Sequence, residues 1–253
     1  MSTTAHRTRR PLRFLVGAML PALVLVGCGA DDADPASGPP EAPQQLMPPP
    51  ADEQAETTEG VPIAELADAE WVEETAADNA IPRRAMAAYA GAALRMAETH
   101  PDCNMGWNTL AGVGSVESSH ASIDGAGLDA EGVAQPAIIG PVLDGSEGVM
   151  AIEDTDQGEL DGDGQWDRAV GPMQFLPETW ERYAVDGNLD GETDPQQIDD
   201  AVLTAAVYLC ESSEDLTVDD DWVRAVTTYN QSMAYARDVG ARATLYEPED
   251  LDS

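Results

Sequence analysis

An alanine-rich segment, residues 82–100, most constrains the fold of this chain. It reads PRRAMAAYAGAALRMAETH, opens with Pro82 at a first-turn position and is followed by Pro101. Alanine and unbranched side chains have high helix propensity, and proline is favoured at the start of a helix but excluded from its interior. The segment therefore predicts a helix that Pro101 ends.

Helical patterns recur along most of the chain. A long segment, residues 118–170, is instead rich in Gly, Pro and Asp, which is typical of binding loops or lids. A short hairpin around 137–143 and 149–152 fits the pattern, but no strand alternation is long enough for a sizeable sheet. We expect a mostly α fold with long loops. The other helical patterns cover residues 63–79, 104–117, 175–185, 198–213 and 220–239.

The N-terminus carries four arginines and then the apolar run FLVGAMLPALVLVG, which together are typical of an export signal, residues 1–27. The apolar part is shorter than the roughly 20 residues of a membrane-spanning helix. It ends in Leu-Val-Gly-Cys, which resembles the bacterial lipobox, so we predict lipidation of Cys28 and anchoring to the outer face of the cell membrane. The alternative is a free thiol in an ordinary signal peptide.

The chain divides further by composition. Residues 28–60 are Pro-rich and acidic with almost no large apolar side chains, so we expect a disordered tether. A globular domain, 61–245, and an acidic tail, 246–253, follow.

The charge is strongly negative, with 12 Lys and Arg against 48 Asp and Glu, a net −36. Four of the basic residues lie in the export signal, so the mature chain is more negative still. This balance excludes nucleic acid and electrostatic adhesion to anionic lipid as binding modes. Membrane attachment then depends on the lipid alone, and we expect a monomer.

Cysteine usage follows from export. With Cys28 lipidated, Cys103 and Cys210 remain, and an oxidising compartment favours a disulfide between them. The loop that it closes is worth about 4 to 5 kcal/mol in the loop-entropy treatment. Two buried thiols are the alternative.

The first candidate for chemistry is Glu117. Leu110, Val113 and Glu117 share one helical face, so the carboxylate lies on the apolar side of a helix that contains Gly112 and Gly114. Desolvation raises the pKa of a carboxyl group and makes it a general acid near neutral pH. The alternatives are a buried partner or a helix-end position that reaches solvent. The glycines indicate close approach by another backbone or a ligand.

Two later segments add polar and aromatic groups. VGPMQFLPETW, residues 170–180, combines a Gly-Pro turn, the amide of Gln174 and aromatic surface, which suits a saccharide groove but equally a loop that enters a helix. Tyr229 and Asn230 follow on a helix, with Tyr235 one to two turns on. A tyrosine hydroxyl there could bond a buried carboxylate or a substrate, or simply belong to the core.

Taken together, GVGSVESSH (112–120), VGPMQFLPETW (170–180) and TTYNQS (227–232) have the order and approximate spacing of the lytic murein transglycosylases. The chain particularly resembles the B-type branch with its lysozyme-like domain, as an actinobacterial-type lipoprotein, over residues 81–239. The resemblance implies that Glu117 is the single catalytic acid. It also implies a glycan-binding set made of Ser118, Met173, Gln174, Phe175, Tyr229 and Asn230.

The activity implied is cleavage of the MurNAc-β-1,4-GlcNAc bond of peptidoglycan with formation of 1,6-anhydroMurNAc, for cell-wall turnover and remodelling. One carboxyl group suffices for this reaction, whereas most glycosidases need two. No cofactor is required, and the partner is the glycan strand. A lysozyme-type muramidase and a non-catalytic calcium-dependent glycan-binding lipoprotein are the alternatives. The chain departs from its relatives at Ser119, followed by His120, whose role the sequence leaves open.

A candidate calcium loop begins at Asp186. Its D-x-N-x-D-G spacing is that of an EF-hand, but position 12 is Gln197 where an EF-hand has Glu. The B-type enzymes take their last acidic ligand later, which favours Asp200 over its rivals Asp194 and Asp199. A merely hydrated Asp/Gly turn is the alternative. The predicted ligands of this structural calcium are Asp186, Asn188, Asp190, Glu192 and Asp200. A second acidic stretch, 154–167, also resembles a metal site in composition, but its spacing matches no metal-binding loop. We expect a glycan-facing or solvated loop there and assign it no ligands.

Overall fold

The computed structural model describes residues 38–55, 57–146 and 149–248. Within these ranges the chain is mostly helical, which confirms the predicted fold class. The helices are α1 (Ala69–Asp78), α2 (Arg83–Thr99), α3 (Trp107–Ser118), α4 (Pro177–Tyr183), α5 (Ile198–Glu211), α6 (Asp219–Tyr229) and α7 (Met233–Leu245). Short 3-10 turns lie at Ile63–Glu65, Pro101–Cys103 and Ile123–Gly125, and the strands are β1 (Gly127–Leu128) and β2 (Ala134–Gln135).

The predicted export signal, the lipidation site Cys28, the start of the tether and the end of the acidic tail lie outside the described residues. Among the described helices, none combines the length and the apolar character needed to span a membrane.

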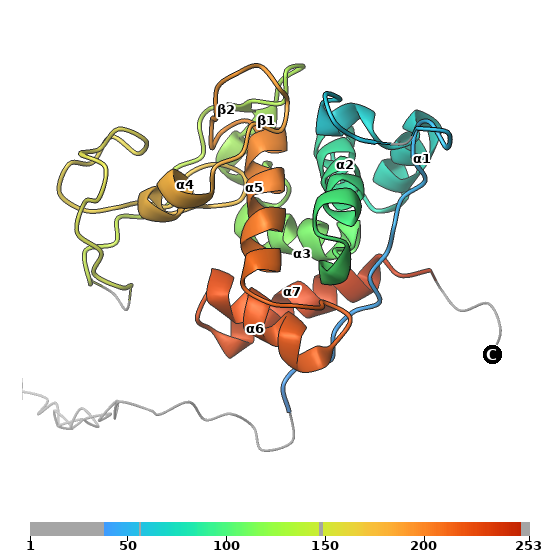
Figure 1. The fold of residues 1–253 in the computed structure, drawn as a ribbon. Coiled ribbons are helices and arrows are strands. Elements are labelled where there is room, and N and C mark those ends of the chain that lie inside the picture. Colours follow the sequence, from blue (N-terminus) through green and yellow to red (C-terminus); the bar gives the residue numbers. More distant parts are fainter. Residues whose placement is uncertain (1–37, 56, 147–148, 249–253) are drawn as a thin grey trace, which may run out of the picture. The chain divides into compact units, whose positions relative to one another are not determined.

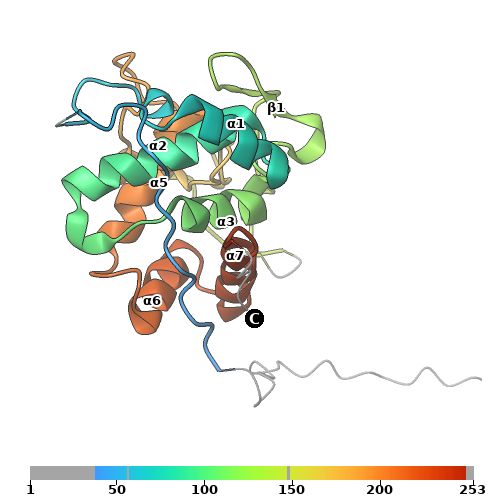
Figure 2. The ribbon, with the colours of Figure 1, turned by 90° about the vertical axis from the view of Figure 1, so that its right-hand side faces the viewer.

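Helix α2 is the element around which α1, α3 and α5 pack (Figures 1 and 2). Its small side chains are almost all buried, so neighbours approach its backbone closely. At Gly91 a Cβ atom would lie 1.6 Å from the carbonyl oxygen of Ile63, so the turn that contains Ile63 rests directly on the helix. The alanine-rich composition thus serves packing as well as helix propensity.

Helix α3 lies between α2 and α7 (Figure 2). At Gly112 a Cβ atom would lie 2.9 Å from the carbonyl oxygen of Val239 in α7, so the predicted close approach of another backbone is confirmed. At Gly114 the neighbour is a side chain, because a Cβ there would meet the Tyr89 hydroxyl at 2.0 Å. The two glycines therefore let α7 and Tyr89 close on α3.

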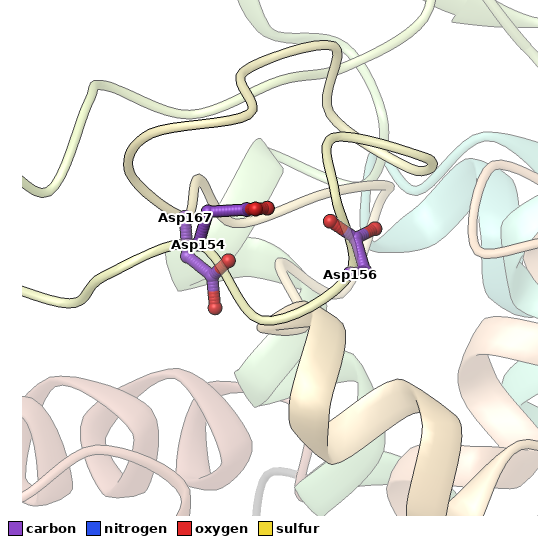
Figure 3. Close-up of side chains that lie close together, drawn as sticks. All are labelled: Asp154, Asp156 and Asp167. Atoms are coloured by element: carbon purple, nitrogen blue, oxygen red, sulfur yellow. The ribbon is translucent and has the colours of Figure 1, made fainter.

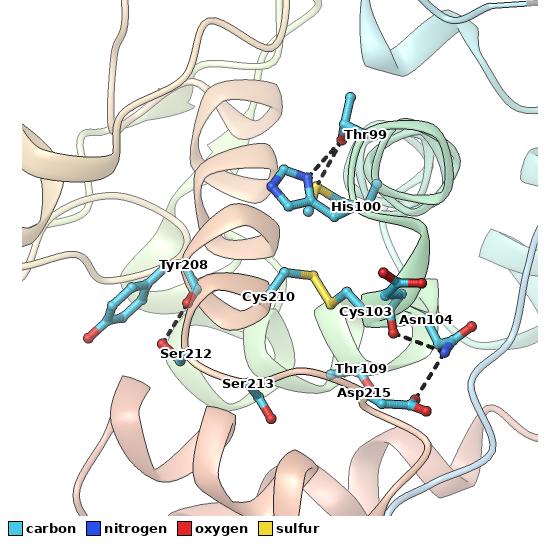
Figure 4. Close-up of a disulfide and its surroundings, with 12 residues drawn as sticks. Thr99, His100, Cys103, Asn104, Thr109, Tyr208, Cys210, Ser212, Ser213 and Asp215 are labelled. Carbon is cyan, nitrogen blue, oxygen red and sulfur yellow. Dashed lines mark hydrogen bonds between the residues drawn. A yellow bond between two sulfur atoms is a disulfide. The ribbon is translucent and has the colours of Figure 1, made fainter.

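The predicted disulfide between Cys103 and Cys210 is present, with a Cα–Cα distance of 5.5 Å (Figure 4). Cys103 ends the turn after α2, and Cys210 lies in the last turn of α5. The bridge therefore joins the C-terminal ends of two helices that pack on one another.

The small sheet lies elsewhere than expected. β1 and β2 pair antiparallel between residues 127 and 135. Between the described residues of the expected hairpin segments, 137–143 and 149–152, the pairing is limited to a bond from the Ile152 amide to the Leu143 carbonyl, 2.9 Å, next to an isolated bridge between Asp144 and Ala151. Both segments instead bond to residues 165–170: the Gly140 amide donates to the Ala169 carbonyl at 2.8 Å, and the Asp167 amide donates to the Ile152 carbonyl at 3.0 Å.

The helical pattern over 220–239 is broken into α6 and α7, where the sequence predicts one helix. Asn230 is extended, with φ −143° and ψ 121°, and the Ser232 hydroxyl caps α7 by accepting the amide of Tyr235 at 3.3 Å. A serine that caps a helix satisfies backbone donors that would otherwise be unpaired, so it favours a new start at this point. The break redirects Tyr235.

The described residues 38–55 and 57–60 differ from the expected disordered tether. The Leu46 amide donates to the Asn108 side chain at 3.0 Å, and the Leu46 carbonyl accepts the Trp107 amide at 3.0 Å. The Ala51 amide donates to the Leu66 carbonyl at 2.8 Å. The few apolar side chains of this segment suffice because its backbone groups find partners on the helices. The compact unit therefore begins at Gly38 and not at residue 61.

Candidate active site

Glu117 is the second-last residue of α3, and its side chain is half-buried. The Tyr235 hydroxyl, from the first turn of α7, donates to its Oε1 atom at 2.5 Å. Burial raises the pKa of Glu117 from 4.5 to about 7, against the lowering effect of the Tyr235 bond. The carboxyl group is therefore poised to give up and take back a proton near neutral pH.

Two cavities meet at Glu117. The first, of about 430 Å³, is walled by residues 123–126 and 136–141, and the second, of about 530 Å³, by residues from the 143–152 loop, α4, α5 and 228–232. Glu117 and Gln174 line both cavities. The acid thus lies at the junction of a two-armed cleft, where a bond inside an extended ligand would be placed.

Gln174 is presented by a tight turn. Val170 and Phe175 exchange backbone hydrogen bonds of 2.8 and 2.9 Å, and Gly171 has φ +77°. A Cβ at Gly171 would lie 1.7 Å from the carbonyl oxygen of Pro195, so only glycine fits this corner. Gln174 itself is left-handed, with φ +51°, and its Nε2 donates to the Gly171 carbonyl at 3.0 Å. The turn holds the amide toward the cleft.

Aromatic rings form much of the wall of the second cavity. Phe175 packs against Tyr229 with ring centroids 5.6 Å apart, and Tyr229 packs against Tyr208 at 5.7 Å. All three rings line the cavity together with Asn230. Proteins bind the faces of saccharides with flat apolar rings and amide groups. The second cavity therefore has the composition of a saccharide-binding surface.

The tyrosine that contacts the acid is Tyr235. The sequence places Tyr229 and Asn230 beside Glu117, but the Tyr229 hydroxyl donates to the Met173 carbonyl at 2.7 Å. Burial raises the pKa of Tyr229 well above 10, and the charge of Glu117 adds to this effect, so the two groups are still neighbours. Tyr229 therefore holds the Gln174 turn, and Tyr235 holds the acid.

Two of the predicted glycan-binding residues face inward. Ser118 is 1% exposed, and its hydroxyl donates to the Pro172 carbonyl at 2.6 Å while accepting the Ala121 amide at 2.8 Å. Met173 is fully buried. Neither residue lines the cleft; both support it from behind.

The wall of the first cavity was not assigned from the sequence. Apart from Glu117 and Gln174, it consists largely of aliphatic and proline side chains, and it includes one further carboxylate, the exposed Asp124. The only signal was the length and Gly/Pro content of the 118–170 segment, which is typical of binding loops. The members are Ile123, Asp124, Ala126, Pro136, Ala137, Ile138, Ile139, Gly140 and Pro141.

The candidate calcium loop brings Asp186 and Asp200 together. The Oδ1 atom of Asp186 is buried without a hydrogen-bond partner, and the Asp200 carboxylate accepts the amides of Gly187 at 2.8 Å and Asp194 at 2.9 Å. Burial raises the pKa of Asp200 to about 6, and the charge of Asp186 contributes. Calcium takes six to eight oxygen ligands, and the orphaned Asp186 oxygen and the Asp200 carboxylate are of the chemical type that it binds, so these two residues are compatible with a calcium site.

The other predicted ligands and their rivals bond to partners of their own. Asn188 and Asp190 bond to one another at 2.9 Å, and Asp190 also accepts the amide of Glu192. Asp199, a rival ligand, instead pairs with Arg84 at 2.5 Å. The Gln197 side chain caps α5 by accepting the amides of Asp199 and Asp200, which explains glutamine at position 12.

The second acidic stretch also gathers carboxylates. Oxygen atoms of Asp154, Asp156 and Asp167 lie within 4.8 Å of one another (Figure 3). Each accepts hydrogen bonds from its own loop, such as those from the Thr155 amide to Asp167 at 2.9 Å and from the Gly158 amide to Asp154 at 2.9 Å. These bonds hold the three carboxylates in place within the loop.

Comparison with known families gives one match. Residues 148–244 match the family described as the Transglycosylase SLT domain. The match includes the Gln174 turn and Tyr229, but it does not include Glu117. It covers less than half of the chain. No curated protein sequence matches.

Two solved structures are similar to this chain, both of the Escherichia coli lytic transglycosylase Slt35. The complex with calcium shares 14% identity at a TM-score of 0.42, over 69% of this chain and 73% of that one. The complex with bulgecin A shares 12% identity at a TM-score of 0.36, over 80% of this chain and 96% of that one. Both TM-scores lie below 0.5, so neither likeness establishes a common fold.

Proposed function

We propose that this protein is a lytic transglycosylase of peptidoglycan, of the B-type with a lysozyme-like domain. The observation that carries the proposal is Glu117, a carboxyl group with a pKa raised to about 7 at the junction of two cavities. The family match over residues 148–244 supports the same reading.

In the proposed reaction Glu117 acts twice. As an acid it protonates the oxygen of the MurNAc-β-1,4-GlcNAc bond, while the N-acetyl group of the substrate stabilises the oxocarbenium-like centre. As a carboxylate it then takes the proton of the MurNAc C6 hydroxyl, which attacks C1 and closes the 1,6-anhydro ring. The hydrogen bond from the Tyr235 hydroxyl stabilises the Glu117 carboxylate between the two steps, so the buried anion has a hydrogen-bond donor.

The glycan strand is proposed to lie along both arms of the cleft. Gln174 and Asn230 offer amide groups, and Phe175, Tyr208 and Tyr229 offer flat faces. The aliphatic arm takes the strand on the other side of the acid.

A hydrolytic muramidase is the second candidate, and one observation favours it. Asp124 lines the first cavity together with Glu117, so a second carboxylate is available to activate water. The products separate the two chemistries, because a transglycosylase leaves 1,6-anhydroMurNAc ends and a hydrolase leaves reducing ends.

The test is digestion of purified sacculi followed by mass spectrometry of the muropeptides. We expect 1,6-anhydro products from the wild type and none from Glu117→Gln. Reducing ends alone would establish the muramidase, and no soluble products from a folded wild type would leave only a glycan-binding protein.

Calcium is proposed to bind the Asp186 loop through Asp186, Asn188, Asp190 and Asp200, with the backbone carbonyl of Glu192. The ion would tie the loop to the start of α5 and has no part in the chemistry. Its contribution is therefore to stability.

Anchoring to the outer face of the membrane through lipid on Cys28 is likewise proposed, from the sequence alone. Metabolic labelling with a radioactive or clickable fatty acid tests it. Labelling that persists in Cys28→Ala would refute it.

A further inference from the structure

His120 lies between two tyrosines just beyond the acid. Its Nδ1 atom is 3.2 Å from the hydroxyl of Tyr89 in α2, and its Nε2 atom is 3.2 Å from the hydroxyl of Tyr246, which follows α7. His120 is 8% exposed and Tyr89 is fully buried. One imidazole therefore joins three elements: α2, the end of α3 and the end of α7.

The turn that carries His120 is strained. Ser119, His120 and Ala121 have φ values of +51°, +57° and +64°, three consecutive left-handed residues without a glycine. Side chains with a Cβ disfavour this conformation, so contacts elsewhere must offset its cost. The His120 amide bonds to the Gly114 carbonyl at 2.9 Å, and the two tyrosines hold the ring. Glu117 lies only two residues before this turn.

Two of the contacts between α7 and the α3 region involve Glu117 and His120. At the start of α7, Tyr235 donates to Glu117, and at its end Tyr246 bonds to His120. The ring of Tyr246 also packs against Trp107 at the start of α3, with centroids 5.5 Å apart. Movement of Tyr246 relative to His120 would therefore change the position of Tyr235 relative to Glu117.

A neutral imidazole can bond to both tyrosines. One of its ring nitrogens donates and the other accepts, and each tyrosine hydroxyl can do either. Burial lowers the pKa of His120 to about 4, and the nearby Arg242 adds to the effect, so the ring is neutral in the range where Glu117 titrates.

We propose that His120 is a positioning residue for Glu117: the neutral imidazole, held by Tyr89 and Tyr246, locks the left-handed turn after α3 and keeps the carboxyl group of Glu117 buried. The inference rests on the proposed role of Glu117 as the acid. Without the bonds from His120 to Tyr89 and Tyr246, the last turn of α3 frays and water reaches Glu117. The pKa of Glu117 then falls toward 4.5, because burial is the largest cause of its rise.

The experiment measures the pKa of the Glu117 carboxyl group directly, by ¹³C NMR of glutamate-labelled protein, with Glu117→Gln to assign the signal. We expect His120→Leu to lower this pKa by about one pH unit or more. His120→Gln should largely restore it, since a carboxamide has both a donor and an acceptor. The matched control is His100→Leu, at the exposed end of α2, where the ring contacts only its neighbour Thr99 in hydrogen bonding.

An unchanged Glu117 pKa in folded His120→Leu would overturn the proposal, as would a fall in His120→Gln equal to that in His120→Leu. If His120→Leu does not fold, Tyr246→Phe decides, with a smaller fall expected and no fall refuting. The NMR signal needs no turnover. Failure of the proposed function would instead appear as a wild type that releases no muropeptides, whatever the titration shows.

Discussion

Replacing Glu117 with glutamine should make the protein inactive and, above neutral pH, more stable. Burial raises the pKa of Glu117 from 4.5 to about 7. Because the folded-state pKa is raised, the stability that the protonated carboxyl group contributes is fully present below pH 4.5 and is lost as the pH rises through 7. The rise in pKa from 4.5 to about 7 corresponds to a loss of about 3 kcal/mol in the free energy of unfolding. Glutamine keeps the shape and a hydrogen-bonding oxygen but does not ionise.

The assay is urea unfolding of wild type and Glu117→Gln between pH 4 and pH 8.5. We expect the difference in unfolding free energy to shift by up to about 3 kcal/mol in favour of the variant between the two ends of this range. The difference cancels the background from the other acidic residues. Glu98→Gln is the contrasting control, because hydrogen bonds from Thr57 and Thr58 lower the pKa of Glu98 to about 2. The stability that this carboxylate contributes is lost only as the pH falls from 4.5 through 2, so the Glu98→Gln difference should stay nearly constant between pH 5 and pH 8.5. A pH-independent difference for Glu117→Gln would refute the buried acid.

Three other perturbations test separate contacts. Tyr235→Phe removes the donor that lowers the pKa of Glu117, so the alkaline limb of the pH–activity profile should move to higher pH; a limb that stays in place contradicts the contact. Replacing Cys103 and Cys210 together with serine should cost about 4 to 5 kcal/mol in urea unfolding, and a loss below about 1 kcal/mol would show that the bridge contributes little. Calcium should raise the melting temperature of the wild type but not of Asp186→Ala; equal curves with calcium and with a chelator would exclude the site.

Local patterns predicted much of this molecule. The alanine-rich segment predicted α2, and the apolar face that contains Glu117 predicted a desolvated carboxyl group. The disulfide followed from the pairing of Cys103 with Cys210. These features depend on helix periodicity, on a buried face or on the number of available partners, all of which the sequence displays directly.

What the sequence alone determined is therefore the approximate position of most helices and that Glu117 lies on an apolar face. Only the tertiary structure decided what meets Glu117 there. The break before Ser232 turns Tyr235 to the acid, and Tyr229 is left to hold the Gln174 turn. Residues 38–55 and 57–60 pack on the domain through backbone bonds that composition does not reveal. These contacts join positions distant in the sequence, and their geometry depends on how the helices pack, which a local period does not encode.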